Sequence, residues 1–397
     1  MRPGQKFQLR PRVRMKRSPI DISLPSTLAH SFSPVLALIC SCGRTVQIAL
    51  NHTDENSERA NQGPRPLHCE CGRSLGNQES GLLRLGSALP YWGEIDEARM
   101  RQILRLAEER GWRPAVGQSL PGSLTQYVES NGRGGFKDIL PWHPGSRILD
   151  VGSGWGAISA ELAREYTVIS LEGVEERARF IALRARQDRL ANLYSVRAVL
   201  PFLRLGAEQF DGIVLNGVLE WVGVWQPSIN PRTAQVEFLR EMRRLLRPGG
   251  SVYLAIENRF GWPELRGAID HSGLPYTSLL PRFLARWVVA GQSLYRSQAN
   301  SGYRTYTYTL QGYRKLFRAA GLRSREIWIC PSGYNQPHEI LPLQQSAIRY
   351  FVNRHELSRA GHWRHWMKHR VKQMLGQEWL WRTFGSDFLF ILEPADA

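Results

Sequence analysis

The chain has 397 residues, 42% of them hydrophobic, and a formal net charge of +17. This composition excludes a largely disordered protein, and no apolar stretch is long enough to cross a bilayer. The charge is concentrated in residues 1–17 and 345–386, which leaves the remainder nearly balanced and argues against an extended nucleic-acid surface.

Residues 1–34 are rich in proline, serine and arginine, a composition that predicts a disordered basic tail. The apolar residues that follow the basic ones are interrupted by Ser33 and Pro34, and no small residue directly precedes Cys40. This pattern does not fit a secretory signal, so we expect a cytoplasmic protein.

Two pairs of cysteines indicate a zinc-ribbon-like module in residues 35–80. The segment CSCGR carries Cys40 and Cys42, and CECGR carries Cys69 and Cys71. Short loops that present two thiols followed by a glycine are typical of tetrahedral zinc sites, although zinc knuckles normally place two residues between the thiols and this chain places one. Three interpretations stay open: structural zinc, a ribbon that has lost its metal, or a redox or disulfide role.

Residues 81–140 are predicted to form a helical linker or lid. An apolar stripe falls at helical spacing between Ile95 and Ala107, acidic residues occupy the first turn, and Gly111 closes the helix. A helix that simply packs on the core is an equally good interpretation. The glycine-rich segment NGRGGFKDILPWHPG marks the border with the main domain, which we expect to span residues 141–397.

The main domain alternates predicted strands and helices. Apolar runs predict strands at 147–151, 167–171, 194–198, 211–216, 251–257, 325–330 and 387–392. Helices separate the first five, which predicts an α/β fold with a doubly wound, mostly parallel seven-stranded Rossmann-like sheet. Such sheets bind ligands at the carboxyl ends of their strands.

The segment ILDVGSGWG places a glycine-rich turn at the end of the first of these strands. Gly152, Gly154 and Ala157 also satisfy the spacing of a dinucleotide site. Asp150 directly precedes the turn, where a carboxylate would hold an ammonium group and repel a pyrophosphate. Glu172 ends the next strand, a position suited to the two hydroxyls of a ribose. The two acids favour a cationic nucleoside over a dinucleotide.

Four segments resemble, in order, the motifs of the class I S-adenosylmethionine-dependent methyltransferases. They are ILDVGSGWG, SLEGV, FDGIVLNGVLEWV and LRPGGSVYLAIEN, and the resemblance covers roughly residues 140–335. It implies S-adenosylmethionine as the cofactor. By the resemblance, the residues that surround the cofactor are Asp150, Gly152, Ser153, Gly154, Glu172, Gly173 and Asn216.

The resemblance also assigns parts of the cofactor to individual residues. Asp150 would contact the methionine part and Glu172 the ribose, while Asn216 would lie below the sulfonium. After the third strand the family usually offers an Asp or Asn to the adenine amino group, and this chain departs from that pattern with Arg197 followed by Ala198. Backbone amides would serve in place of that side chain.

Methyl transfer from a sulfonium depends mainly on holding the nucleophile in line with the methyl group, and an oxygen nucleophile also needs a proton acceptor. The segment after the fifth predicted strand offers Glu257, Asp270 and His271. We predict His271, paired with Asp270, as the base. The alternative is that this pair only orders its loop.

Residues 331–386 are predicted to be a helical, basic insertion. An apolar stripe at helical spacing consists of Trp363, Trp366, Met367, Val371 and Met374. Basic residues occupy the other faces, so residues 345–376 could make a peripheral contact with an anionic membrane. Packing on the sheet as a lid or dimer contact is the alternative.

These features favour an S-adenosylmethionine-dependent methyltransferase that acts on a small-molecule or glycan-type acceptor, with oxygen as the expected methyl acceptor. An RNA methyltransferase is the alternative, supported by the zinc-like ribbon and the basic ends but not by the nearly neutral remainder of the chain. A non-catalytic protein that keeps the fold is the third possibility.

Overall fold

The computed structural model describes residues 34–50, 63–199, 204–290, 302–354 and 373–395. The strands are β1 (Val35–Ile39), β2 (Thr45–Ala49), β3 (Arg65–His68), β4 (Ser74–Glu79), β5 (Leu82–Leu85), β6 (Arg147–Val151), β7 (Thr167–Glu172), β8 (Leu193–Arg197), β9 (Phe210–Asn216), β10 (Leu246–Glu257), β11 (Leu322–Ile329), β12 (Leu341–Pro342) and β13 (Asp387–Pro394). The α-helices are α1 (Glu97–Arg110), α2 (Trp112–Ser119), α3 (Gly122–Glu129), α4 (Ala157–Leu162), α5 (Glu175–Gln187), α6 (Val222–Trp225), α7 (Pro231–Leu245), α8 (Trp262–Leu265), α9 (Arg282–Ala290), α10 (Leu310–Ala319), α11 (Gln345–Arg354) and α13 (Glu378–Phe384). Three 3-10 helices are η2 (Asn131–Ile139), η3 (Leu219–Trp221) and η4 (Thr277–Leu279).

The main sheet has the strand order β12-β11-β13-β10-β9-β6-β7-β8-β5-β4-β3. Strands β6 to β10 run parallel to their neighbours within that group, and β13 lies antiparallel between β10 and β11. From β6 the chain first adds strands on one side, β7 and β8, and then returns to add β9 and β10 on the other. The predicted doubly wound α/β fold is confirmed, and the reversal at β6 puts a ligand-binding crevice at the carboxyl ends of β6 and β9.

The sheet is wider than the predicted seven strands. Strand β5 pairs in parallel with β8, and β4 and β3 continue the sheet beyond it as an antiparallel hairpin. The boundary expected at residue 80 therefore falls in the turn between two paired strands, and the segment expected to be a helical linker begins with a strand. The run LLRL is too short to show a strand period, and only its pairing with β8, in which Leu82 lies opposite Ser195, makes it a strand.

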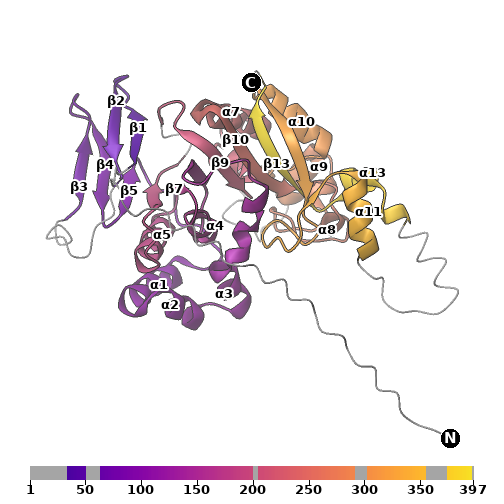
Figure 1. The fold of residues 1–397 in the computed structure, drawn as a ribbon, viewed down its shortest axis with the longest axis horizontal. Helices are drawn as coiled ribbons and strands as arrows, with labels where there is room; N and C mark the ends of the chain where they lie inside the picture. Colours follow the sequence, from indigo (N-terminus) through magenta and orange to yellow (C-terminus); the bar gives the residue numbers. More distant parts are fainter. Residues whose placement is uncertain (1–33, 51–62, 200–203, 291–301, 355–372, 396–397) are drawn as a thin grey trace, which may run out of the picture. The chain divides into compact units, whose positions relative to one another are not determined.

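Buried side chains cover both faces of the central strands. In β6, Leu149 and Val151 point into one core layer with α7 and α10, while Ile148 points into the other layer with residues of α4 and α5. Strands that are buried on both faces carry apolar residues at nearly every position, which is why the sequence shows them as continuous apolar runs. Helices on both faces complete a three-layer arrangement (Figure 1).

The first hairpin, β1–β2, packs against the main domain. Leu36 and Leu38 are buried in the same core layer as β9, and Leu38 bridges to Leu205. The backbone of Ala37 also exchanges hydrogen bonds with the side chain of Gln209, at 2.7 and 3.0 Å. The cysteine-bearing hairpins are therefore built into the fold.

The predicted amphipathic helix is α1. Asp96 accepts a hydrogen bond from the backbone of Arg99 at its start, and Gly111 ends it with a φ of +90°. Together with α2 and α3 it forms a core cluster that includes Trp155 and Phe180, which tie these helices to the glycine loop and to α5.

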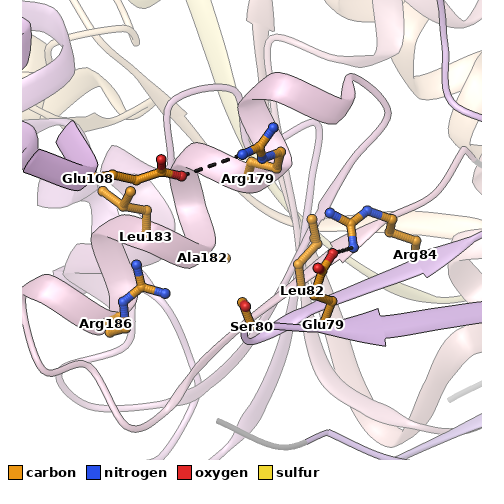
Figure 2. A pocket seen from close by; sticks show the side chains of 9 residues that line it. All are labelled: Glu79, Ser80, Leu82, Arg84, Glu108, Arg179, Ala182, Leu183 and Arg186. Atoms are coloured by element: carbon orange, nitrogen blue, oxygen red, sulfur yellow. Dashed lines mark hydrogen bonds and ion pairs between the residues drawn. The ribbon is translucent and has the colours of Figure 1, made fainter. Parts of the chain in front are cut away.

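A cavity of about 390 Å³ lies where the β4–β5 turn meets α1 and α5 (Figure 2). Its charged side chains form ion pairs, Arg84 with Glu79 at 2.9 Å and Arg179 with Glu108 at 3.4 Å. The cavity lies where the added strands pack against the helices, and it contains none of the predicted site residues.

Two predicted segments fall largely outside the described residues. The basic tail occupies 1–34, of which only residue 34 is described, and four of the five residues of the apolar stripe lie in 355–372. The described parts of the insertion are β12, α11 and α13. Within the described ranges, no helix combines the length and apolar character needed to cross a membrane.

Candidate functional site

The glycine loop joins β6 to α4 at the centre of the sheet edge. Gly152 and Gly154 have φ values of +68° and +57°, which side chains other than glycine rarely adopt. The amide of Gly152 donates to Leu171 O at 2.8 Å, so the loop is tied to the adjacent strand β7. A Cβ atom at Gly152 would also lie 3.0 Å from a methyl group of Val218. The loop therefore exposes backbone atoms, without side chains, at this edge of the sheet.

Asp150 and Glu172 end up at the same edge because β6 and β7 are neighbouring parallel strands. The backbone amides of Gly154 and Val174 donate to Glu172, at 2.8 and 3.0 Å, and thereby fix its carboxylate beside the loop. Asp150 is buried and accepts a hydrogen bond from the hydroxyl of Ser159. Burial raises the pKa of Asp150 to about 7, so an ammonium group placed against it would favour the ionised form.

Three cavities follow this edge of the sheet. The first, of about 310 Å³, is lined by residues that include Glu172, Gly173, Ala198, Val199 and Trp225. The second, of about 200 Å³, is lined by residues that include Arg133, Asp150, Ser153, Asn216 and Glu220. The third, of about 390 Å³, is lined by residues that include Glu257, Glu264, Asp270, Tyr303 and Asp387.

The three cavities share walls. Gly152, Arg177 and Trp221 line both the first and the second, and His271 and Tyr334 line both the second and the third. Because they share these residues, the three cavities lie next to one another, from the end of β8 to the loop after β10. A ligand in the first two would present its far end to whatever occupies the third.

The predicted cofactor residues all line the first or second cavity. The hydroxyl of Ser153 turns back to Asp150 O at 2.8 Å, so this side chain orders the loop. Asn216 has a side-chain oxygen and nitrogen that are buried and find no hydrogen-bond partner in the described part of the chain. Gly173 accepts a hydrogen bond from the amide of Leu89, and a Cβ atom there would lie 2.6 Å from the Leu89 side chain.

Arg197, which stands near the position where the family usually offers an acid or amide, points away from the first cavity. Its guanidinium donates to the carbonyls of Leu85 and Gly86 and to Glu175, and so fastens β5 to β8. Ala198 and Val199 take its place in the cavity lining. Glu172 is the one acid among the described residues that line this cavity.

The acid and histidine residues after β10 are arranged differently from the prediction. His271 Nε2 lies 3.1 Å from Glu257 Oε1 and 3.7 Å from Glu220 Oε1. Asp270, the expected partner, instead accepts a hydrogen bond from the amide of Ser272 at 2.7 Å. Adjacent residues in a turn point in different directions, and here the chain folds back so that His271 meets the end of β10.

The proximity of the three ionisable groups shifts their pKa values. Burial opposes protonation of His271, but its attraction to Glu257 outweighs this and raises the pKa of the imidazole to about 10. Burial acts to raise the pKa of Glu257, and the same attraction reverses the direction and lowers it. Burial and repulsion from Glu257 raise the pKa of Glu220 to about 8. Both directions favour a carboxylate on Glu257 and an imidazolium on His271 at neutral pH.

Arg133 and Glu220 are among the residues of the second cavity that sequence reasoning missed. Arg133, in η2, is 6% exposed, donates to Asn335 O at 3.1 Å and lies with its guanidinium carbon 3.7 Å from the centre of the Tyr127 ring. Glu220 follows β9 within the quoted motif FDGIVLNGVLEWV and is fully buried. Two sequence signals could have indicated them: Arg133 is a basic residue among the glycines of NGRGG, and Glu220 is a single acid in an apolar stretch.

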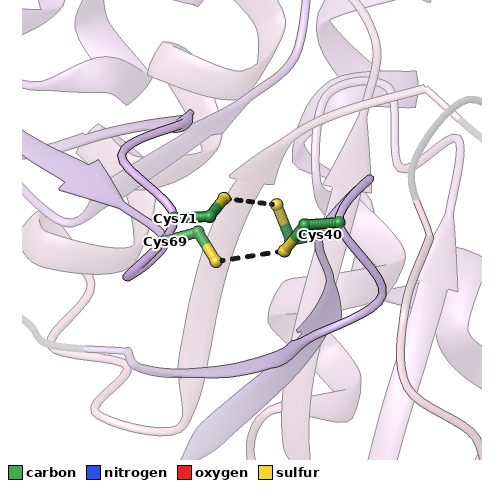
Figure 3. Close-up of side chains that lie close together, drawn as sticks. Cys40, Cys69 and Cys71 are labelled. Carbon is green, nitrogen blue, oxygen red and sulfur yellow. Dashed lines mark hydrogen bonds between the residues drawn. The ribbon is translucent and has the colours of Figure 1, made fainter.

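The four cysteines of the two CxCGR turns meet between the hairpins β1–β2 and β3–β4 (Figure 3). The sulfur of Cys40 lies 3.7 Å from that of Cys71, and the sulfur of Cys42 lies 3.7 Å from that of Cys69. Tetrahedral zinc with Zn–S bonds of about 2.3 Å places its sulfurs about 3.8 Å apart. The two measured separations match this value, and all four sulfurs lie within 4.8 Å of one another in spite of the unusual spacing in the sequence.

Comparison with known proteins gives a consistent pattern. A family model described as "Methyltransferase domain" matches residues 149–254. The ubiquinone biosynthesis O-methyltransferase of Caulobacter vibrioides is 31% identical over 219 residues, which cover 53% of this chain and 78% of that protein. The protein of the same name from Caulobacter sp. (strain K31) is 32% identical over 164 residues, 41% of this chain and 54% of the relative. The second match thus spans about half the length of the relative.

Among solved structures, the phosphoethanolamine N-methyltransferase 2 of Haemonchus contortus in complex with S-adenosyl-L-methionine aligns with a TM-score of 0.40 and 12% identity. The alignment covers 77% of this chain and 62% of that one.

Proposed function

Because the chain belongs to the class I S-adenosylmethionine-dependent methyltransferases, we propose that it transfers the methyl group of S-adenosylmethionine to an oxygen atom of a small-molecule acceptor. The two Caulobacter relatives carry names that describe O-methylation. The observation that carries the proposal is the run of three cavities with shared walls, from Glu172 past Asp150 to His271.

The first two cavities divide the cofactor between them. We place the adenosine in the first, with both ribose hydroxyls donating to Glu172, whose oxygens have further lone pairs beside the two amide bonds. The methionine part occupies the second, with its ammonium group at Asp150 and its carboxylate at Arg133. Asn216, which also lines the second cavity, then lies beside the sulfonium.

The third cavity holds the acceptor, and the Glu257–His271 pair takes its proton. When bound, S-adenosylmethionine supplies an activated methyl group, so the protein has to align the acceptor oxygen and remove its proton. Glu257 lines the third cavity, and its Oε2 is buried and finds no hydrogen-bond partner among the described residues. Since the imidazole of His271 is already protonated, the proton passes to the pair through Glu257, and Asp270 has no part in this step.

The lining of the third cavity favours a hydroxylated small molecule over RNA. Its described residues contain neither lysine nor arginine, so His271 is the one basic side chain among them that could meet a nucleic-acid phosphate. Serine, threonine and tyrosine hydroxyls make up much of the remainder. A phenolic or glycan-type acceptor suits this lining.

A methyl-transfer assay tests the proposal. The protein is incubated with methyl-labelled S-adenosylmethionine and separate phenolic, sugar and RNA acceptors, and products are identified by mass spectrometry. We expect label on an oxygen of a small acceptor and none on RNA. Labelled RNA with unlabelled small acceptors would support the alternative function, and failure to bind the cofactor would refute the assignment.

Replacing Arg133 by glutamine is expected to weaken S-adenosylmethionine binding about tenfold or more, since a hydrogen bond to a charged group contributes about 1.5–3 kcal/mol. Calorimetry measures the dissociation constant. Methylthioadenosine, which lacks the amino acid part of the cofactor, is the control ligand and should bind the variant as it binds the parent protein. If the variant bound both ligands more weakly by the same factor, Arg133 would not be the residue that binds the cofactor's carboxylate.

We also propose that the four cysteines hold a structural zinc ion, which would link the two hairpins. Replacing Cys42 by serine should lower the zinc content from about one ion per chain and lower the melting temperature. Ser41→Ala, between two ligands, is the matched control and should keep the zinc. Parent protein without zinc, or a variant of unchanged melting temperature, would contradict the structural role.

Thiols kept for zinc suit a reducing compartment, so we place the enzyme in the cytoplasm.

A further inference from the structure

Glu220 is a buried acid that the steps above leave without a role. Its side chain is fully buried, and within the described ranges neither carboxylate oxygen has a hydrogen-bond partner. An isolated ionised carboxylate in such a place is costly, because burial removes its hydration and nothing replaces it. The group must therefore be neutral or lie beside a cation that is part of the working site.

Glu220 lines the second cavity, in which the proposal places the sulfonium, and several ionisable side chains lie around it. His271 Nε2 lies 3.7 Å away, with Glu257 on the far side of the imidazole. Asp150 lines the same cavity and accepts from Ser159.

The cations of that cavity have partners elsewhere. Arg133 donates to Asn335 O, and Arg177 pairs with Glu94. His271 is thus the one charged group among the described residues in ion-pair contact with Glu220, and it is shared with Glu257.

The reaction changes the charge of this cavity. S-adenosylmethionine carries a positive sulfur, the product S-adenosylhomocysteine has a neutral thioether, and an acceptor hydroxyl releases one proton in the same event. We propose that the protonation state of Glu220 compensates for this change of charge. Glu220 is ionised while the sulfonium is bound. When the sulfur becomes neutral, Glu220 takes up the acceptor's proton, which Glu257 and His271 relay to it. This inference rests on the proposed function.

The step balances as follows. The acceptor oxygen forms a bond to the methyl carbon, the carbon–sulfur bond breaks, and sulfur keeps its electron pair. The O–H proton passes to Glu257, His271 passes its Nε2 proton to Glu220, and Glu257 then returns a proton to His271. The net change is one proton on Glu220 and one positive charge lost from sulfur. The next sulfonium to bind expels that proton to solvent.

The raised pKa of Glu220, about 8, agrees with a group that keeps its proton at neutral pH until a cation arrives. The pKa of Asp150 is also raised, but this carboxylate faces the ammonium group that both ligands carry. Proton release from Asp150 should therefore be equal for the two ligands and cancel when they are compared.

Calorimetry in buffers of different ionisation enthalpy tests the proposal, because it counts the protons released on binding. At pH 7, S-adenosylmethionine should release close to one proton more than S-adenosylhomocysteine from the parent protein. Glu220→Gln should abolish this difference and lower kcat at least about tenfold. Glu264→Gln removes an acid of the third cavity that is absent from the second, and it should keep the difference in proton release.

Equal proton release by the two ligands in the parent protein would overturn the proposal, even if the Glu220 variant failed to fold. Retention of the difference in a folded Glu220→Gln protein would also overturn it. Neither result would affect the proposed function, which fails only if the ligands do not bind or no acceptor is methylated.

Discussion

Replacing Glu257 by glutamine should lower kcat by about a hundredfold to ten-thousandfold, the range expected when a positioned proton acceptor is lost. The amide cannot take the acceptor's proton, and the imidazole of His271 loses its counter-ion. Glu257 is outside the set of residues that line the first two cavities, so the dissociation constant of S-adenosylmethionine should change by less than about threefold. Steady-state kinetics and calorimetry measure the two quantities separately.

The matched control for this variant is Glu237→Gln, the same chemical change on the exposed face of α7. It should behave as the parent protein does in both measurements. If Glu257→Gln kept more than about a third of the parent kcat, the proton acceptor would have to be another group. His271→Gln would then be the next variant to measure, since that imidazole lines both the second and the third cavity.

Replacing Glu172 by alanine should weaken S-adenosylmethionine binding about a hundredfold. Two ribose hydroxyls that donate to a carboxylate would each contribute about 1.5 kcal/mol or more, and every 1.4 kcal/mol is a factor of ten. The variant also loses the bonds that hold Gly154 and Val174, so the glycine loop becomes less well positioned. Calorimetry with S-adenosylhomocysteine measures the loss without turnover.

Glu176→Ala is the control for this second prediction. Glu176 stands four residues after Glu172, at the start of α5, where it pairs with Arg101 at 3.2 Å and does not line the first cavity. Its removal should leave binding within about threefold of the parent value, because an ion pair with a largely exposed partner contributes little. Similar losses in both variants would indicate a general disturbance of this edge.

The sequence was informative where function depends on neighbours along the chain. The glycine loop, the acid before it and the acid at the end of β7 lie in or directly beside strands that are buried on both faces. Such strands produce apolar runs, and parallel pairing then brings their carboxyl ends together. For this reason the relation of Asp150 to Glu172 followed from the order of the strands.

The remaining features depend on contacts that the order of residues does not encode. His271 meets Glu257, 14 residues earlier, because the loop after β10 folds back, while the adjacent Asp270 turns to Ser272. Arg133 reaches the second cavity from η2, which the sequence marks only as a glycine-rich border. Strand β5 exists through its pairing with β8. In each case the decisive partner is close in space and distant in sequence.

A crystal structure with bound S-adenosylhomocysteine is the most direct test of the arrangement described above. It should show the ribose hydroxyls on Glu172, the amino acid part between Asp150 and Arg133, and the sulfur directed past Asn216 toward His271. A nucleoside bound away from Glu172, or a sulfur atom directed away from the cavity that contains Glu257, would contradict it.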